Sequence, residues 1–158
     1  MMMKYAKIAG LVAVLAVAVT GIASAEGKFD KVLKARQSWM QIYSFNLGNL
    51  GAMAKGKAPY DAAKASAFAE NLLAAASMKN GAMWPAGSDN SVLGDKTRAK
   101  PEIWSTYPKV AEKGKALVAA AQNLVKVAGS GLDALKGGVG TAGKACGGCH
   151  KPFREKKK

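Results

Sequence analysis

Apolar side chains recur every three or four residues over four stretches of the chain, which is the spacing of one face of an amphipathic helix. The stretches cover residues 28–55, 59–81, 106–128 and 132 onward. None of them shows the two-residue alternation of a half-buried strand. The pattern therefore predicts an all-α protein that folds as a four-helix bundle. The apolar positions are Phe29, Val32, Leu33, Met40, Tyr43, Leu47, Leu50, Ala54, Ala62, Ala65, Phe68, Ala69, Leu72, Leu73, Ala76, Val110, Leu117, Val118, Ala121, Leu124, Val125, Leu132, Leu135, Val139 and Ala142.

Glycine and proline mark the links between these helices. Gly56 and Pro59 separate the first two, and Pro59 is placed to open the second because its fixed φ suits a first helical turn. Residues 129–131, Gly-Ser-Gly, separate the last two helices. A long link, 81–100, is rich in Gly, Pro, Ser, Asp and Asn and joins the middle two through a short turn at 101–104. Links of this length often cover a functional site.

Four glycines of the fourth helix, Gly137, Gly138, Gly140 and Gly143, precede the two cysteines. Each lowers the intrinsic helix propensity by about 1 kcal/mol relative to alanine. A glycine also lets the backbone approach a neighbouring helix or a flat ligand closely. We expect these glycines to provide such a close approach.

The first 25 residues have the pattern of a secretory signal peptide. Two lysines precede an apolar run at 8–22, and Ala23-Ser24-Ala25 supplies the small residues that a signal peptidase requires, which predicts cleavage before Glu26. The alternative is a membrane anchor, but the run is shorter than the roughly 20 apolar residues of a membrane span. We therefore expect an exported, periplasmic protein with a single domain, residues 26–158, and no membrane span after cleavage.

The chain is strongly basic, with 24 Lys and Arg against 10 Asp and Glu and a formal net charge of +14. It stays basic when the predicted signal, with Lys4 and Lys7, is removed. A basic surface suits nucleic acid, anionic membranes or acidic protein partners. An exported protein meets no genome, so a solvated cationic face is favoured over nucleic-acid binding. In an electron carrier that face would dock a periplasmic or membrane redox partner, for which an acidic protein is a candidate.

The segment "CGGCH" contains both cysteines and the only histidine of the chain, Cys146, Cys149 and His150. This order is the attachment signature of c-type haem, in which each thiol forms a thioether and the imidazole reaches the iron. A disulfide or a thioredoxin-like redox pair is an alternative, but the βαβ pattern of that fold is absent from the sequence. A zinc site would need a fourth ligand such as a carboxylate. No nucleophile and base stand out, so an enzyme is not expected.

Four segments together give the chain its resemblance to a known family. They are "KARQSWMQ" in the first helix, "KGKAPYDAA" before the second, "AKPEIW" before the third and "GKACGGCHKPFR" at the end. The mature chain resembles the cytochrome c prime family, the class II c-type cytochromes, whereas class I cytochromes carry the haem motif near the N-terminus. The resemblance implies an antiparallel four-helix bundle with one covalently bound haem c, which commonly forms a homodimer through its first two helices.

The resemblance also implies roles for individual residues. Cys146 and Cys149 match the thioether positions and His150 matches the axial iron ligand on the proximal side. Arg36 and Gln37 match positions that meet a haem propionate. A guanidinium beside a carboxylate is a favourable pairing, and the alternative for Arg36 is an exposed arginine on a helix surface.

Several further residues are weaker candidates for contact with the haem. Arg154 follows His150 by four residues and would stand beside it on a continuous helix, but Pro152 is expected to end or kink the helix between them. Thr97 and Lys100 in the long link are placed to reach a propionate. Two tryptophans have alternative roles. Trp39 is expected either at an interface or the surface, or in the core. Trp84 is expected either against the haem edge or in the core.

The function depends on Met40, which the resemblance places on the distal side of the iron. In high-spin relatives an apolar side chain there only covers the iron, which stays five-coordinate and binds small gases such as nitric oxide or carbon monoxide. In low-spin relatives a methionine there is the sixth ligand of an electron carrier. We favour the five-coordinate protein, which binds gases and/or carries electrons, over the alternative with Met40 as ligand.

Overall fold

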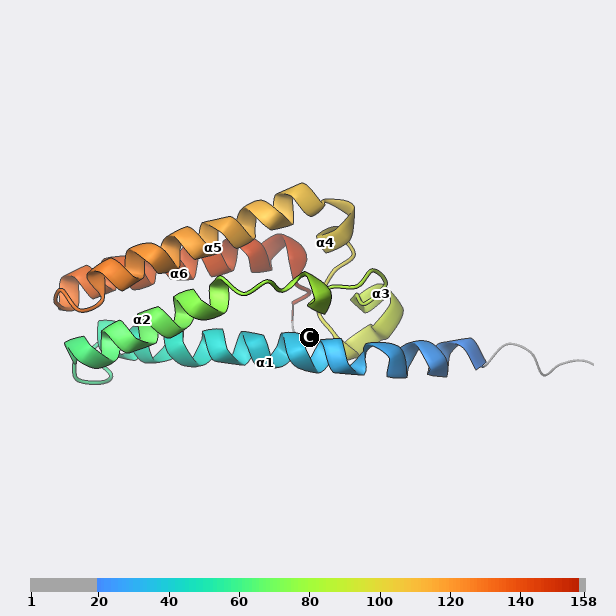
Figure 1. Cartoon of the computed structure of the whole chain (residues 1–158), viewed down its shortest axis with the longest axis horizontal. Coiled ribbons are helices and arrows are strands. Elements are labelled where there is room, and N and C mark those ends of the chain that lie inside the picture. Colours follow the sequence, from blue (N-terminus) through green and yellow to red (C-terminus); the bar gives the residue numbers. More distant parts are fainter. Residues whose placement is uncertain (1–19, 157–158) are drawn as a thin grey trace, which may run out of the picture.

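A computed structural model describes residues 20–156, and the side chains from residue 27 onward. Four long helices account for most of this part of the chain (Figure 1). The short elements lie in the link between the second and third long helices. The long helices are α1 Thr20–Ala54, α2 Ala62–Ala76, α5 Tyr107–Val127 and α6 Leu132–Phe153, and the short elements are α3 Asn90–Leu93, α4 Glu102–Ser105 and the 3-10 turns η1 Gly81–Met83 and η2 Gly94–Lys96.

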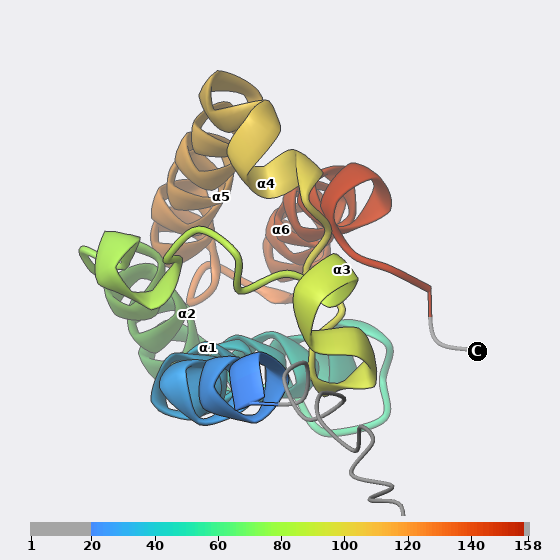
Figure 2. The same ribbon diagram turned by 90° about the vertical axis from the view of Figure 1, so that its right-hand side faces the viewer.

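The four long helices form an antiparallel bundle, as predicted. Viewed along the bundle they occupy its four corners, while α3 and α4 lie across one end (Figure 2). Each helix contacts two neighbours, in the order α1, α2, α5, α6 and back to α1. Among the described residues no helix is long and apolar enough to cross a membrane. The predicted signal peptide lies outside this part except for residues 20–25, which belong to the first turns of α1.

The core of the bundle is formed by the predicted apolar faces. Leu50, Leu72, Leu124 and Leu135, one from each long helix, are fully buried and belong to a single cluster. Burial of a leucine side chain stabilises a fold by roughly 1.5–3 kcal/mol, so these faces hold the bundle together. The second helix of the sequence prediction is too long at both ends, and α2 stops at Ala76 and not at Gly81. α2 begins at Ala62 and not at Pro59, because Asp61 is the N-cap and its Oδ1 accepts a hydrogen bond from Lys64 N (3.0 Å).

The glycines of α6 allow a close helix contact at one position only. A Cβ at Gly138 would lie 2.6 Å from Leu124 Cδ1 and 2.9 Å from Val127 Cγ2, so α5 and α6 touch there. A Cβ at Gly137, Gly140 or Gly143 would meet no atom within 4 Å. The expected close approach to a neighbouring helix is therefore confirmed for Gly138 and wrong for the other three, for which close approach to a flat ligand stays a prediction.

Candidate functional site

The CGGCH segment lies in the last turns of α6. Cys146 and Cys149 are three residues apart, so they share one face of the helix, and both thiols are free and half-buried. Burial raises the pKa of both thiols, and Cys146 raises that of Cys149 further while Lys113 opposes the shift. Among the described side chains no group of three or more His, Cys, Asp or Glu could hold a metal ion.

His150 follows on the same helix and is half-buried. Its pKa is lowered, first by burial and then by the positive charges of Arg154 and Arg98. As predicted, the helix ends between His150 and Arg154: it continues through Pro152 but stops at Phe153, and Arg154 is extended. Arg154 therefore approaches the histidine from the segment beyond the helix and not from the helix surface.

One face of α1 is turned towards the cysteine segment. Arg36, Met40 and Tyr43 are spaced by four and three residues and so lie on the same face. The pKa of Tyr43 is raised, mainly by burial and further by Cys146, so this face and the cysteine segment are within electrostatic reach of each other. Met40 is half-buried and packs against the main core cluster.

Arg36 is buried, with only 5% of its surface exposed. Its Nη2 donates a hydrogen bond to Ser88 O (2.9 Å), and its guanidinium lies 4.7 Å from the centroid of the Trp84 ring. Burial lowers its pKa, and the charge of Asp89 partly opposes this. The alternative of an exposed surface arginine is therefore wrong.

The other nitrogen of the same guanidinium, Nη1, is buried and has no hydrogen-bond partner among the described residues. A buried cation with a free donor is costly, and a carboxylate ligand would remove that cost. Together with two free thiols and an imidazole on the facing helix, this donor fits a haem with a propionate at Arg36.

The remaining candidates have other contacts. Gln37 is exposed, and its Nε2 donates to Lys96 O (3.3 Å). Thr97 Oγ1 accepts a hydrogen bond from Ala99 N (3.1 Å), and Lys100 forms an ion pair with Glu102 (3.3 Å). These contacts hold the long link in place, and a role in contact with haem stays a prediction for all three.

Trp39 and Trp84 differ in burial and in their contacts. Of the two alternatives for Trp39, core packing is confirmed and the interface or surface position is wrong. Only 8% of Trp39 is exposed, its Nε1 donates to Ala75 O (2.9 Å), and its ring lies 4.8 Å from that of Tyr43. An indole can be buried here because the end of α2 supplies an acceptor. Trp84 is half-buried between Arg36 and Trp104, whose Nε1 donates to Trp84 O (2.9 Å).

Sequence reasoning missed several residues of this region. Tyr43 could have been found, because it continues the spacing of Arg36 and Met40. Ser88 and Asp89 gave no signal, since they lie in an irregular link more than 50 residues from Arg36. Arg98 and Lys113 could not be singled out, because the chain has 24 lysines and arginines.

Comparison with known proteins agrees with this geometry. The family described as cytochrome C′ matches residues 31–154. Cytochrome c-554 from Cereibacter sphaeroides is 34% identical over 140 residues, 89% of this chain and 91% of its own. Cytochrome c′ from Allochromatium vinosum is 34% identical over 149 residues, 94% of each chain.

Solved structures are similar as well. A cytochrome c′ from Rhodobacter sphaeroides matches with a TM-score of 0.79 and 34% identity, covering 81% of this chain and 98% of its own. Another cytochrome c′, described as having a ligand-controlled dimer dissociation, has a TM-score of 0.72 and 31% identity over 80% and 95% of the chains. A nitric oxide complex of a mutant cytochrome c′ from Alcaligenes xylosoxidans has a TM-score of 0.70 and 30% identity over 81% and 96%. Given the four-helix bundle, the free thiols beside a histidine on its last helix and these matches along most of the sequence, the chain belongs to the cytochrome c′ family.

Proposed function

We propose that this protein binds small gases such as nitric oxide and carbon monoxide, and/or carries electrons, at a five-coordinate, high-spin haem iron in the periplasm. Cytochrome c′ proteins are periplasmic haem proteins without enzymatic activity, and each carries one covalent haem c. In the proposal Cys146 and Cys149 form the thioethers, His150 is the axial ligand and Arg36 holds a propionate. Haem supplies an iron that can bind a diatomic gas or change its charge by one electron.

The observation that carries this proposal is the composition of the α1 face opposite the cysteines. Met40 is held between Arg36 and Tyr43, and the hydroxyl of Tyr43 donates to Ala75 O (3.2 Å), so it is directed to α2. Met40 packs in the apolar cluster, where a thioether is an ordinary filler. An apolar cover excludes water and large ligands and leaves room for diatomic gases. A relative was solved with nitric oxide bound, which supports this choice of gas.

The alternative is a low-spin electron carrier with Met40 as the sixth ligand. It is supported by the half-buried position of Met40 on the face towards α6. A thioether is a competent iron ligand and raises the reduction potential.

Replacing Met40 distinguishes the two functions. We expect the wild-type protein and Met40→Leu, which keeps the apolar volume, to show the same high-spin absorption spectrum. Both should bind carbon monoxide when reduced. The measurement is absorption spectroscopy of the oxidised, reduced and carbon monoxide-treated proteins. Low-spin bands in the wild type that vanish in Met40→Leu would overturn the five-coordinate proposal and establish the electron carrier.

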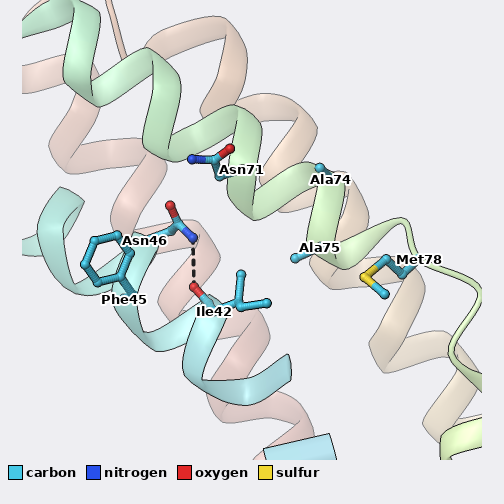
Figure 3. Close-up of a pocket in the computed structure, with 7 residues that line it drawn as sticks. All are labelled: Ile42, Phe45, Asn46, Asn71, Ala74, Ala75 and Met78. Carbon is cyan, nitrogen blue, oxygen red and sulfur yellow. Dashed lines mark hydrogen bonds between the residues drawn. The ribbon is translucent and has the colours of Figure 1, made fainter. Parts of the chain in front are cut away.

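The proposed assembly is a homodimer through α1 and α2. A groove of about 400 Å³ lies between these helices (Figure 3). Its rim includes Phe45, which is 65% exposed, and Asn46 between the helices is only 3% exposed. Asn46 Nδ2 donates to Ile42 O (2.8 Å), but its Oδ1 has no partner among the described residues. The lining residues are Ile42, Phe45, Asn46, Asn71, Ala74, Ala75 and Met78.

A second copy suits this groove because none of its lining residues is charged. Two copies of a strongly basic chain repel each other elsewhere, but they can meet here without burying a cation. That a similar cytochrome c′ dissociates from a dimer supports the proposal.

A charge placed in the groove should separate the two copies. We expect Phe45→Glu to raise the dimer dissociation constant by about tenfold or more, because a carboxylate would be buried in an apolar contact. Sedimentation velocity over a range of concentrations measures it. Tyr107→Glu is the matched control, since Tyr107 is 68% exposed on α5. The same mass for the wild type and Phe45→Glu, or dissociation of the control, would contradict this interface.

A further inference from the structure

Three cations from separate elements lie within electrostatic reach of the haem-attachment segment. Arg98 lies in the link between η2 and α4, Lys113 in α5, and Arg154 at the C-cap of α6. Arg98 and Arg154 both act on His150, and Lys113 acts on Cys149. We call these three residues the basic rim. Arg154 N donates to His150 O (3.0 Å), so the basic rim adjoins the end of the half-buried CGGCH segment.

Backbone hydrogen bonds hold two members of the basic rim next to each other. Ala99 and Arg154 form an antiparallel β-bridge. On either side of it, Glu155 N donates to Arg98 O (2.8 Å) and Lys100 N donates to Phe153 O (3.1 Å). The two arginines therefore extend from paired segments of fixed geometry and not from loose ends.

The basic rim is not neutralised within the described part of the chain. The ion pairs found there are Lys64–Asp61, Lys100–Glu102 and Lys136–Asp133, and none includes a rim residue. Arg98 and Arg154 are exposed and Lys113 is half-buried. Two carboxylates are sequence neighbours of the rim, Glu112 and Glu155, and both are exposed. A guanidinium group without an ion-pair partner suits a planar carboxylate, because it can bind the two carboxylate oxygens through two parallel hydrogen bonds.

We infer that the basic rim is the docking surface for an acidic electron-transfer protein. This inference rests on the proposed haem site, because docking at this edge brings a partner close to the cofactor. One electron leaves the reduced partner, which is oxidised, and reduces the ferric iron, with no bond formed or broken. An acidic protein suits the rim better than a lipid surface does, because the cations lie beside the haem-attachment segment and a lipid headgroup exchanges no electron.

The test uses the haem-loaded protein and a plant-type [2Fe–2S] ferredoxin, an acidic one-electron donor, as the probe. Arg98→Glu is compared with Lys57→Glu, which makes the same change of net charge at an exposed lysine of the link between α1 and α2. Calorimetry measures the dissociation constant of oxidised ferredoxin, and stopped-flow absorbance measures the reduction rate. We expect Arg98→Glu to weaken binding and slow reduction by about fivefold at low salt, with the difference lost near 0.5 M salt, and Lys57→Glu to change either by less than about twofold.

Several results would overturn the inference. One is equal weakening by the two variants, since net charge and not the rim would then control binding. Another is an effect of Arg98→Glu on sedimentation with phosphatidylglycerol vesicles but not on ferredoxin binding, which would assign the rim to lipid. A third is a changed haem content or absorption spectrum in Arg98→Glu, which would assign Arg98 to the cofactor. The spectrum of the wild-type protein tests the haem site separately, so failure of the docking surface and failure of the haem site are distinguishable.

Discussion

The double variant Cys146→Ala, Cys149→Ala is expected to contain no covalently bound haem. Each thiol in the proposal forms one thioether, so removing both leaves only coordination and packing to hold the cofactor. These contacts do not survive denaturation. Haem staining of a denaturing gel, after expression with a c-type assembly system, should be strong for the wild type and absent for the variant.

The same variant is expected to be less stable than the wild-type protein. A ligand that binds only the folded state stabilises it, and that contribution is lost with the haem. The control is Gly147→Ala, a change between the two cysteines where the added Cβ would meet no atom within 4 Å. It should keep full haem staining. Haem that remains attached to the double variant through denaturation would rule out the thioether roles of both cysteines.

Gly138→Val is expected to destabilise the bundle by about 1–3 kcal/mol. Gly138 is buried against Leu124 and Val127 of α5, and a Cβ there would lie 2.6 Å and 2.9 Å from their side chains. Leu124 is fully buried and its Cα lies only 3.6 Å from the same point, so it cannot easily move aside. The two helices must separate to admit the valine. Urea unfolding followed by circular dichroism measures the loss.

Gly140→Val makes the same substitution two residues later, at an exposed position where a Cβ meets no atom within 4 Å. It should change the free energy of unfolding by less than about 0.5 kcal/mol, because surface substitutions away from special features have small effects. Equal destabilisation by both variants would mean that the contact with α5 does not set the cost at Gly138.

The existence and order of the helices could be predicted because each depends on a local period. Apolar residues spaced by three or four positions identify a buried face wherever they occur, and all four long helices agree with that pattern. Their ends were less predictable. Pro59 and Asp61 are both good start signals, and the choice of Asp61 depends on a hydrogen bond to Lys64 N that the sequence pattern does not specify.

The candidate site also has one part that the sequence predicts and one part that it does not. Cys146, Cys149 and His150 lie within five residues of one helix, so their types and spacing alone predicted a c-type haem. The surroundings of Arg36 could not be predicted, because Ser88 lies 52 residues away in an irregular link. The glycines of α6 show the same limit: their sequence positions look equivalent, but only Gly138 faces a neighbouring helix.

The sequence by itself determined the helical class, the bundle and the haem motif, because periodicity and a five-residue motif are properties of local chain. Only the tertiary structure decided that Trp39 is core and Arg36 buried with a free donor, and that Arg98, Lys113 and Arg154 come within electrostatic reach of the CGGCH segment. These facts depend on which segments meet when the helices pack. Such contacts join residues far apart in the chain, and no local pattern encodes them.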